Sequence, residues 1–113
     1  MSRSDQELVA DALTHLSVMR THLTRGDLGD QTVADAVCLR LAAAIEAIAN
    51  GSDALRTGTF GDDWALMWAT RNRIAHGYAH IDFSIVTATV ERDVPWFEDR
   101  LQHAAIRLSN GKA

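Results

Sequence analysis

Apolar residues recur at helical spacing through the first fifty residues of the chain. Ser4 and Glu7 form the S-x-x-E pattern of a capping box, and the apolar stripe that follows ends at Gly26. A second stripe begins at Val33 and ends before Asn50-Gly51, a sequence typical of a helix C-terminus. The stripes comprise Leu8, Ala12, Leu16, Met19 and Leu23, then Val33, Val37, Leu41, Ala44, Ile45 and Ile48. They predict two long helices, and the many alanines of the second would let a neighbouring helix approach closely.

The pattern is interrupted by glycines over residues 51–63 and then resumes. Three glycines in this stretch favour a loop with room for one helical turn. Asp62 or Asp63 then provides the N-cap of a third helix, which Gly77 ends. Its apolar positions are Trp64, Met67, Trp68 and Ile74.

The last third of the chain predicts a short helix followed by a longer one. The short helix starts near Asp82 or Ser84, although its β-branched residues leave a strand open. Pro95 suits the first turn of the final helix, with Asp93 as its N-cap and Gly111 as its end. We therefore expect a single all-α domain over residues 1–113, an up-and-down bundle of four main helices plus a short helix.

Composition narrows the class of protein. Apolar residues make up 47% and charged residues 23% of 113 residues, as in ordinary globular domains. The formal net charge of −4 argues against the broadly basic surface of a general nucleic-acid or membrane binder, so any phosphate contact must be local. The single cysteine, Cys38, cannot form an intramolecular disulfide. With no secretory h-region and no apolar run long enough to span a membrane, we expect a soluble cytoplasmic protein.

The stretch RNRIAHGYAH, residues 71–80, concentrates the candidate chemistry. On an ideal helix Asn72, Arg73 and His76 share one face, whereas Arg71 and His76 lie about 140° apart. Arg71 and His76 can therefore meet if the helix ends or distorts between them, or if each comes from a different chain.

Arginine and histidine together suit chemistry on phosphate. Arginine holds phosphate and the extra charge of a phosphoryl transition state, and histidine moves a proton near neutral pH. RNA supplies its own nucleophile, the 2′-hydroxyl, so this pair with an orienting amide suffices for metal-free cleavage to a 2′,3′-cyclic phosphate. Basic residues near a helix C-terminus also complement the helix dipole, and spacing alone leaves that structural interpretation open.

RNRIAHGY resembles the motif of the HEPN superfamily, and more closely that of its HepT toxin branch, R-x-x-x-x-H-x-Y with a polar residue after the arginine. Arg71, Asn72, His76 and Tyr78 match these positions. RLAAAIEAIAN resembles the second long helix of the family, and HIDFSIVTATVERDVPWFEDRL resembles its short helix, proline and final helix.

The resemblance implies a homodimer in which the motifs of both subunits face a shared cleft. It implies a metal-independent endoribonuclease that needs no cofactor and acts as the toxin of a toxin–antitoxin pair. The substrate that it implies is RNA, and tRNA in particular. His76 becomes the general base or acid, Arg71 the phosphate contact and Asn72 a positioning group. Tyr78 becomes the residue to which an MntA-type nucleotidyltransferase antitoxin attaches AMP, although a tyrosine packed on the bundle would fit the same position.

Several neighbouring residues carry weaker expectations. Arg73 is an RNA-backbone candidate or a solvated arginine, and His80 is interpreted as surface polar. Trp64 and Trp68 match the apolar stripe, so packing is favoured over base stacking. His15, His22, His103 and Cys38 show no metal-ligand spacing. The alternative to the enzyme is a non-catalytic HEPN module that binds a nucleotide or docks on a nucleotidyltransferase, and a purely structural dimer is a third possibility.

Overall fold

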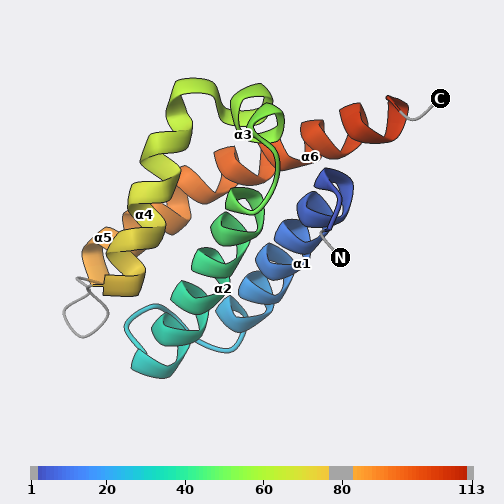
Figure 1. The fold of residues 1–113 in the computed structure, drawn as a ribbon. Helices are drawn as coiled ribbons and strands as arrows, with labels where there is room; N and C mark the ends of the chain where they lie inside the picture. Colours follow the sequence, from blue (N-terminus) through green and yellow to red (C-terminus); the bar gives the residue numbers. More distant parts are fainter. Residues whose placement is uncertain (1–2, 77–82, 112–113) are drawn as a thin grey trace.

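The chain folds into helices joined by short connections (Figure 1). The structure, a computed structural model, describes residues 3–76 and 83–111. Its elements are α1 (Asp5–Leu23), α2 (Gln31–Ala49), α3 (Asp53–Phe60), the 3₁₀ turn η1 (Gly61–Asp63), α4 (Trp64–His76), α5 (Phe83–Ala88), the π-helical turn η3 (Thr89–Asp93) and α6 (Val94–Asn110). No strand occurs within the described residues, so the all-α prediction is confirmed and the segment after Asp82 is helical rather than extended.

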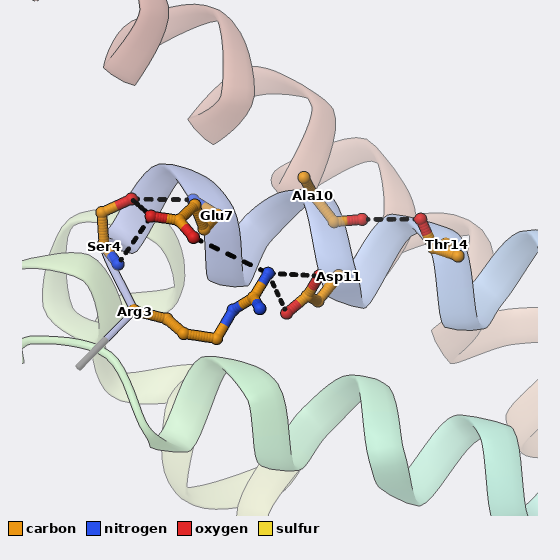
Figure 2. A network of polar contacts seen from close by, with 6 residues as sticks. All are labelled: Arg3, Ser4, Glu7, Ala10, Asp11 and Thr14. Carbon is orange, nitrogen blue, oxygen red and sulfur yellow. Dashed lines mark hydrogen bonds and ion pairs between the residues drawn. The ribbon is translucent and has the colours of Figure 1, made fainter. Parts of the chain in front are cut away.

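The capping box predicted at the start of α1 is present (Figure 2). The Ser4 hydroxyl accepts a hydrogen bond from the Glu7 amide at 3.1 Å, and the Ser4 amide donates to the Glu7 carboxylate at 3.4 Å. Arg3 reaches across this first turn to Asp11 at 3.0 Å. The two hydrogen bonds between Ser4 and Glu7 satisfy amides that a helix N-terminus otherwise leaves without partners, which fixes where α1 begins.

Helices α1 and α2 lie side by side along most of their length (Figure 1). Asp30 caps α2 by accepting from the Thr32 amide, and Asn50 ends it as the sequence predicts. The stripes of the two helices are buried, apart from Leu23, which is half-buried. Helix α6 packs on α1, and α4 packs on α2. The predicted apolar periodicity thus corresponds to the actual core, in which burial of side chains such as Leu16 and Ile45 supplies the main favourable energy of folding.

Residues 53–60 form a helix of two turns, so the prediction of a loop with room for one helical turn is wrong. Ser52 caps this helix, α3, by accepting from the Leu55 amide at 3.0 Å. Asp5 at the start of α1 in turn accepts from the Ser52 amide and hydroxyl, at 3.0 and 2.6 Å. These hydrogen bonds lower the pKa of Asp5, with Arg56 adding to the effect.

The aromatic side chain of Phe60 anchors α3 in the core. Its ring lies 5.4 Å from Phe97, 5.8 Å from Trp96 and 5.9 Å from Trp64, measured between centroids. Such tilted pairs add to the energy of burial. A helix too short to be stable alone is therefore held by tertiary packing, which explains why glycine content misled the prediction.

The final two helices are one continuous helical path rather than two separate helices. Through η3 the Val94 amide donates to the carbonyl of Thr89, five residues back. Asp93 has helical backbone angles and makes no side-chain cap hydrogen bond, so its predicted role as N-cap is wrong. Pro95 occupies the first turn of α6, as predicted. Proline has no amide hydrogen to donate, and the wider π-helical turn before it allows the helical path to continue at this residue.

Candidate functional site

Helix α4 carries the described part of the motif. It begins at Trp64, directly after η1, and ends at His76, and its buried residues Met67 and Ile74 face the core. Trp64 and Trp68 stack on each other with centroids 6.2 Å apart and pack against the core, which confirms the packing prediction for both. The motif residues thus sit on the last two turns of a helix that is firmly anchored at its other end.

Arg71 is held by three neighbouring groups. Its Nη1 donates to the Oδ1 of Asn72 at 3.1 Å, and its Nη2 lies 3.3 Å from the Oε1 of Glu46 on α2. The guanidinium carbon lies 4.8 Å from the ring centroid of Trp68, within the range of a cation–π contact. The Arg71 side chain is 22% exposed and that of Glu46 is 50% exposed, so the guanidinium is ordered without being sealed from solvent.

The other described motif residues differ in exposure. Asn72 is half-buried, with its carbonyl oxygen engaged by Arg71, while Arg73 and His76 are exposed. The side-chain oxygen of Asn72 thus contacts the arginine of the same chain. The face shared by Asn72, Arg73 and His76 lies at the C-terminal end of α4, where cations complement the helix dipole.

The five-residue offset between Arg71 and His76 is not relieved within α4. The segment from Trp64 to His76 is regular α-helix, so the two side chains leave the helix about 140° apart. Among the described residues, no hydrogen bond or ion pair joins them. An end or a distortion of the helix between the two residues is therefore wrong, which leaves the alternative in which each residue comes from a different chain.

Tyr78, the predicted modification site, and His80 lie outside the described residues, as does Gly77. The structure therefore describes the motif through His76, and the described chain resumes at Phe83, the first residue of α5.

Glu46 is the contact of the site that sequence reasoning missed. It lies in RLAAAIEAIAN on α2, at a position whose neighbours Ile45 and Ala47 are buried. Acidic residues are common on the exposed side of a helix, so the sequence alone does not connect Glu46 with the motif. Only the packing of α2 on α4 shows that it faces Arg71.

Within the described residues, no group of three or more His, Cys, Asp or Glu side chains is placed to hold a metal ion. None of the helices formed by these residues combines the length and the apolar character needed to cross a bilayer.

The family model described as "Ribonuclease HepT-like" matches residues 7–104. The chain belongs to the HepT-like ribonuclease family. The match confirms the resemblance predicted from the motif, and it contains Arg71, Asn72, His76 and Tyr78 together with the helices on both sides. Neither a search of curated proteins nor one of solved structures found a match.

Proposed function

We propose that the chain is a metal-independent endoribonuclease, the toxin of a toxin–antitoxin pair, which acts as a homodimer on cytoplasmic RNA and favours tRNA. The observation that carries the proposal is the family match over residues 7–104, which includes a complete R-x-x-x-x-H-x-Y motif. The structure supports it by ordering Arg71 and leaving His76 exposed at the end of the same helix.

The proposed reaction is transfer of a phosphoryl group from the 5′-oxygen of one nucleotide to the 2′-oxygen of its neighbour. A bond forms between the 2′-oxygen and phosphorus, and the bond from phosphorus to the 5′-oxygen breaks. His76 accepts the proton of the 2′-hydroxyl or donates a proton to the departing 5′-oxygen, and Arg71 stabilises the charge on the pentacoordinate phosphorus. The products are a 2′,3′-cyclic phosphate and a 5′-hydroxyl.

A homodimer accounts for the geometry of α4. Two copies of the motif facing one cleft would place the His76 of one subunit opposite the Arg71 of the other, despite their divergence on a single helix. Each pair of Arg71 and His76 in the cleft would then combine residues of both chains. Two sets of Arg71 and Arg73 would make a local positive groove on an acidic chain.

Cleavage of labelled tRNA in the presence of EDTA tests the proposed activity. We expect products with cyclic-phosphate ends from the natural protein, and a loss of at least about 100-fold in rate for Arg71→Ala and for His76→Ala. Two matched controls are available. His103→Ala removes an exposed histidine of α6, and Arg20→Ala removes an arginine paired with Glu98 across helices; both should cleave normally. Full activity of either motif variant would refute the catalytic roles.

Neutralisation by AMP transfer is the regulatory half of the proposal. A nucleotidyltransferase antitoxin of the MntA type would attach AMP to Tyr78, two residues after His76. Each adenylate adds a negative phosphate and a bulky base where the RNA phosphate must bind, so cleavage would stop. Co-expression with the antitoxin should raise the mass of the Tyr78 peptide by that of adenylate, and Tyr78→Phe should keep its unmodified mass. If the Tyr78 peptide of the natural protein stays unmodified, the proposed AMP transfer is contradicted, whereas the proposed ribonuclease activity is not.

A non-catalytic module is the second candidate, favoured by the contact between Glu46 and Arg71. That contact places a carboxylate against the guanidinium, and Arg71 makes no contact with His76 within the described residues. Such a module would bind a nucleotide or dock on a nucleotidyltransferase. Saturable nucleotide binding with intact tRNA would support it over the enzyme.

A further inference from the structure

Glu46 makes a contact with Arg71 that links two helices. Its Oε1 lies 3.3 Å from the Nη2 of Arg71, and the residues are 25 positions apart in the chain. The two other contacts of the guanidinium, with Trp68 and Asn72, come from α4 itself. Glu46 therefore ties the end of the Arg71 side chain to α2, whose packing against α4 is fixed by the core.

The three contacts restrain the guanidinium in different directions. The guanidinium carbon lies over the ring of Trp68, Asn72 engages Nη1 and Glu46 engages Nη2. An arginine side chain has several rotatable bonds, so a defined position of its charged end requires such partners. Two of the five N–H groups of the guanidinium serve the contacts with Asn72 and Glu46, and the other three make no hydrogen bond with the residues that the structure describes.

The contact of Glu46 has two opposite consequences for RNA. Its charge offsets part of the attraction between Arg71 and a phosphate, while its hydrogen bond keeps the arginine in one orientation. A carboxylate that competed with RNA phosphate for Arg71 would do so best by accepting hydrogen bonds from two guanidinium nitrogens at once, as in a bidentate pair. Here Glu46 is bonded to one nitrogen and Asn72 to the other, and the Glu46 carboxylate is half exposed to water, which screens its charge.

We propose that Glu46 is a positioning residue: through its hydrogen bond it holds the Arg71 guanidinium between α2 and the face of Trp68, so that the remaining N–H groups meet the scissile phosphate of RNA. The inference rests on the proposed ribonuclease activity. It assigns a role to a residue outside the motif, on a different helix.

Two substitutions separate the hydrogen bond of Glu46 from its charge. Glu46→Gln keeps the length and an acceptor oxygen but removes the charge, whereas Glu46→Asp keeps the charge but is one methylene too short. For Glu46→Gln we expect kcat within about threefold of the natural enzyme, and for Glu46→Asp a loss of about five- to tenfold in kcat with KM changed by less than about twofold.

The matched control is Glu98, which also pairs with an arginine across helices, Arg20 on α1, at 2.7 Å. Glu98→Gln and Glu98→Asp should both cleave like the natural enzyme. Natural kcat in Glu46→Asp would overturn the proposal. If Glu46→Gln binds RNA more tightly while Glu46→Asp keeps the natural kcat, Glu46 competes with RNA by its charge and does not position Arg71.

The order of Arg71 provides a readout that does not depend on cleavage. The ¹⁵N–¹H heteronuclear NOE of the Arg71 Nε–H group, assigned by its absence in Arg71→Lys, should fall in Glu46→Asp and be retained in Glu46→Gln. If the NOE falls in Glu46→Asp but the natural protein leaves RNA intact, the proposed function is refuted, whereas the positioning of Arg71 by Glu46 is supported. An active enzyme whose Arg71 keeps its order in Glu46→Asp would refute the positioning alone.

Discussion

Arg71 and Arg73 belong to the same turn of α4 but are held in different ways. The side chain of Arg71 contacts an aromatic ring, an amide and a carboxylate, and is 22% exposed. Arg73 is exposed to solvent at the end of the helix. A fixed guanidinium suits recognition of one phosphate in one orientation, whereas a mobile one contributes charge without geometry. The surroundings, rather than the residue type, therefore distinguish a candidate catalytic arginine from a candidate backbone contact.

Arg73→Ala tests whether the second arginine touches RNA. As a backbone contact it would release about one counterion on binding, so its loss should reduce the slope of log Kd against log salt concentration by about one. The kcat should stay close to that of the natural enzyme because the reacting groups are intact. Titrations of uncleaved RNA at several salt concentrations measure the slope, best in a His76→Ala background. An unchanged slope would identify Arg73 as a solvated helix-end arginine.

Cys38 provides a prediction of pH dependence. Burial, with a further contribution from Asp35, raises the pKa of the thiol from 9.0 to about 11. The stabilising contribution of the neutral thiol is complete below pH 9, and it is lost as pH rises through 11, because the unfolded thiol ionises first. The free energy of unfolding should thus fall by up to about 1.4 kcal/mol per pH unit within this window.

Urea unfolding of the natural protein and Cys38→Ala at pH 8 and pH 10 isolates that contribution. Other groups titrate equally in both proteins, so the natural protein should lose about 1 kcal/mol more stability than the variant between these pH values. The same loss in both proteins would show that the thiol does not account for it.

The motif residues of the site could be predicted from the sequence, but their partners could not. Arg71, Asn72 and His76 lie within ten residues of one another and match a spaced pattern. Glu46 is 25 residues from Arg71 and lacks any distinguishing spacing. Its relation to the site comes from the rotation of α2 against α4, which is set by the packing of many apolar side chains at once. Local patterns do not carry that information.

At the scale of elements, the helices that the sequence predicts have local signals, whereas the features that it misses depend on tertiary packing. The long helices α1 and α2 have local signals that agree with each other, namely caps and uninterrupted stripes. Helix α3 contains Gly58 and ends beside Gly61, and its stability depends on Phe60 packing in the core. The continuity of α5, η3 and α6 likewise depends on an unusual hydrogen bond before Pro95, where local rules favour a break.

The two glycines at α3 should respond oppositely to alanine. Gly61 has φ +55° and ψ −132°, a conformation that residues with a Cβ rarely adopt, although no atom lies within 4 Å of the added carbon. Gly61→Ala should therefore lower the free energy of unfolding by about 1–3 kcal/mol through backbone strain alone. Gly58 is helical, and its Cβ would lie 3.6 Å from Arg107, an ordinary contact.

Gly58→Ala serves as the matched control for the same element. It should stabilise the protein by up to about 1 kcal/mol, because alanine loses less backbone entropy in a helix. Urea unfolding compares both variants with the natural protein. Equal effects of the two substitutions would mean that the conformation of Gly61 is not the source of strain.

At the scale of the whole molecule, the acidic net charge and the RNA substrate have to be reconciled. A net charge of −4 repels RNA on average, so binding must depend on a short basic segment at one end of α4. A second copy of that segment in the same cleft would double the local positive charge without altering the rest of the surface. The charge balance and the divergence of Arg71 from His76 thus favour the same arrangement, a cleft shared between subunits.

Mixing two inactive variants tests whether the site is shared. If the Arg71 of one subunit acts with the His76 of the other, a dimer of Arg71→Ala with His76→Ala retains one intact pair. The second pair in that dimer lacks both residues. In an equal mixture about half of the dimers are mixed, so activity should recover to about a quarter of the natural value. The variants should be unfolded together and refolded, or co-expressed, so that subunits exchange.

A site within one subunit makes the opposite prediction, because every subunit of the mixture then lacks one of the two residues. No cleavage above that of the separate variants would be expected. Size-exclusion chromatography with light scattering must accompany the assay, since a monomer would remove the basis for complementation. A quarter of the natural rate from a dimer would assign Arg71 and His76 to different chains, whereas no recovery from an exchanged dimer would place the working pair on the last turns of a single α4.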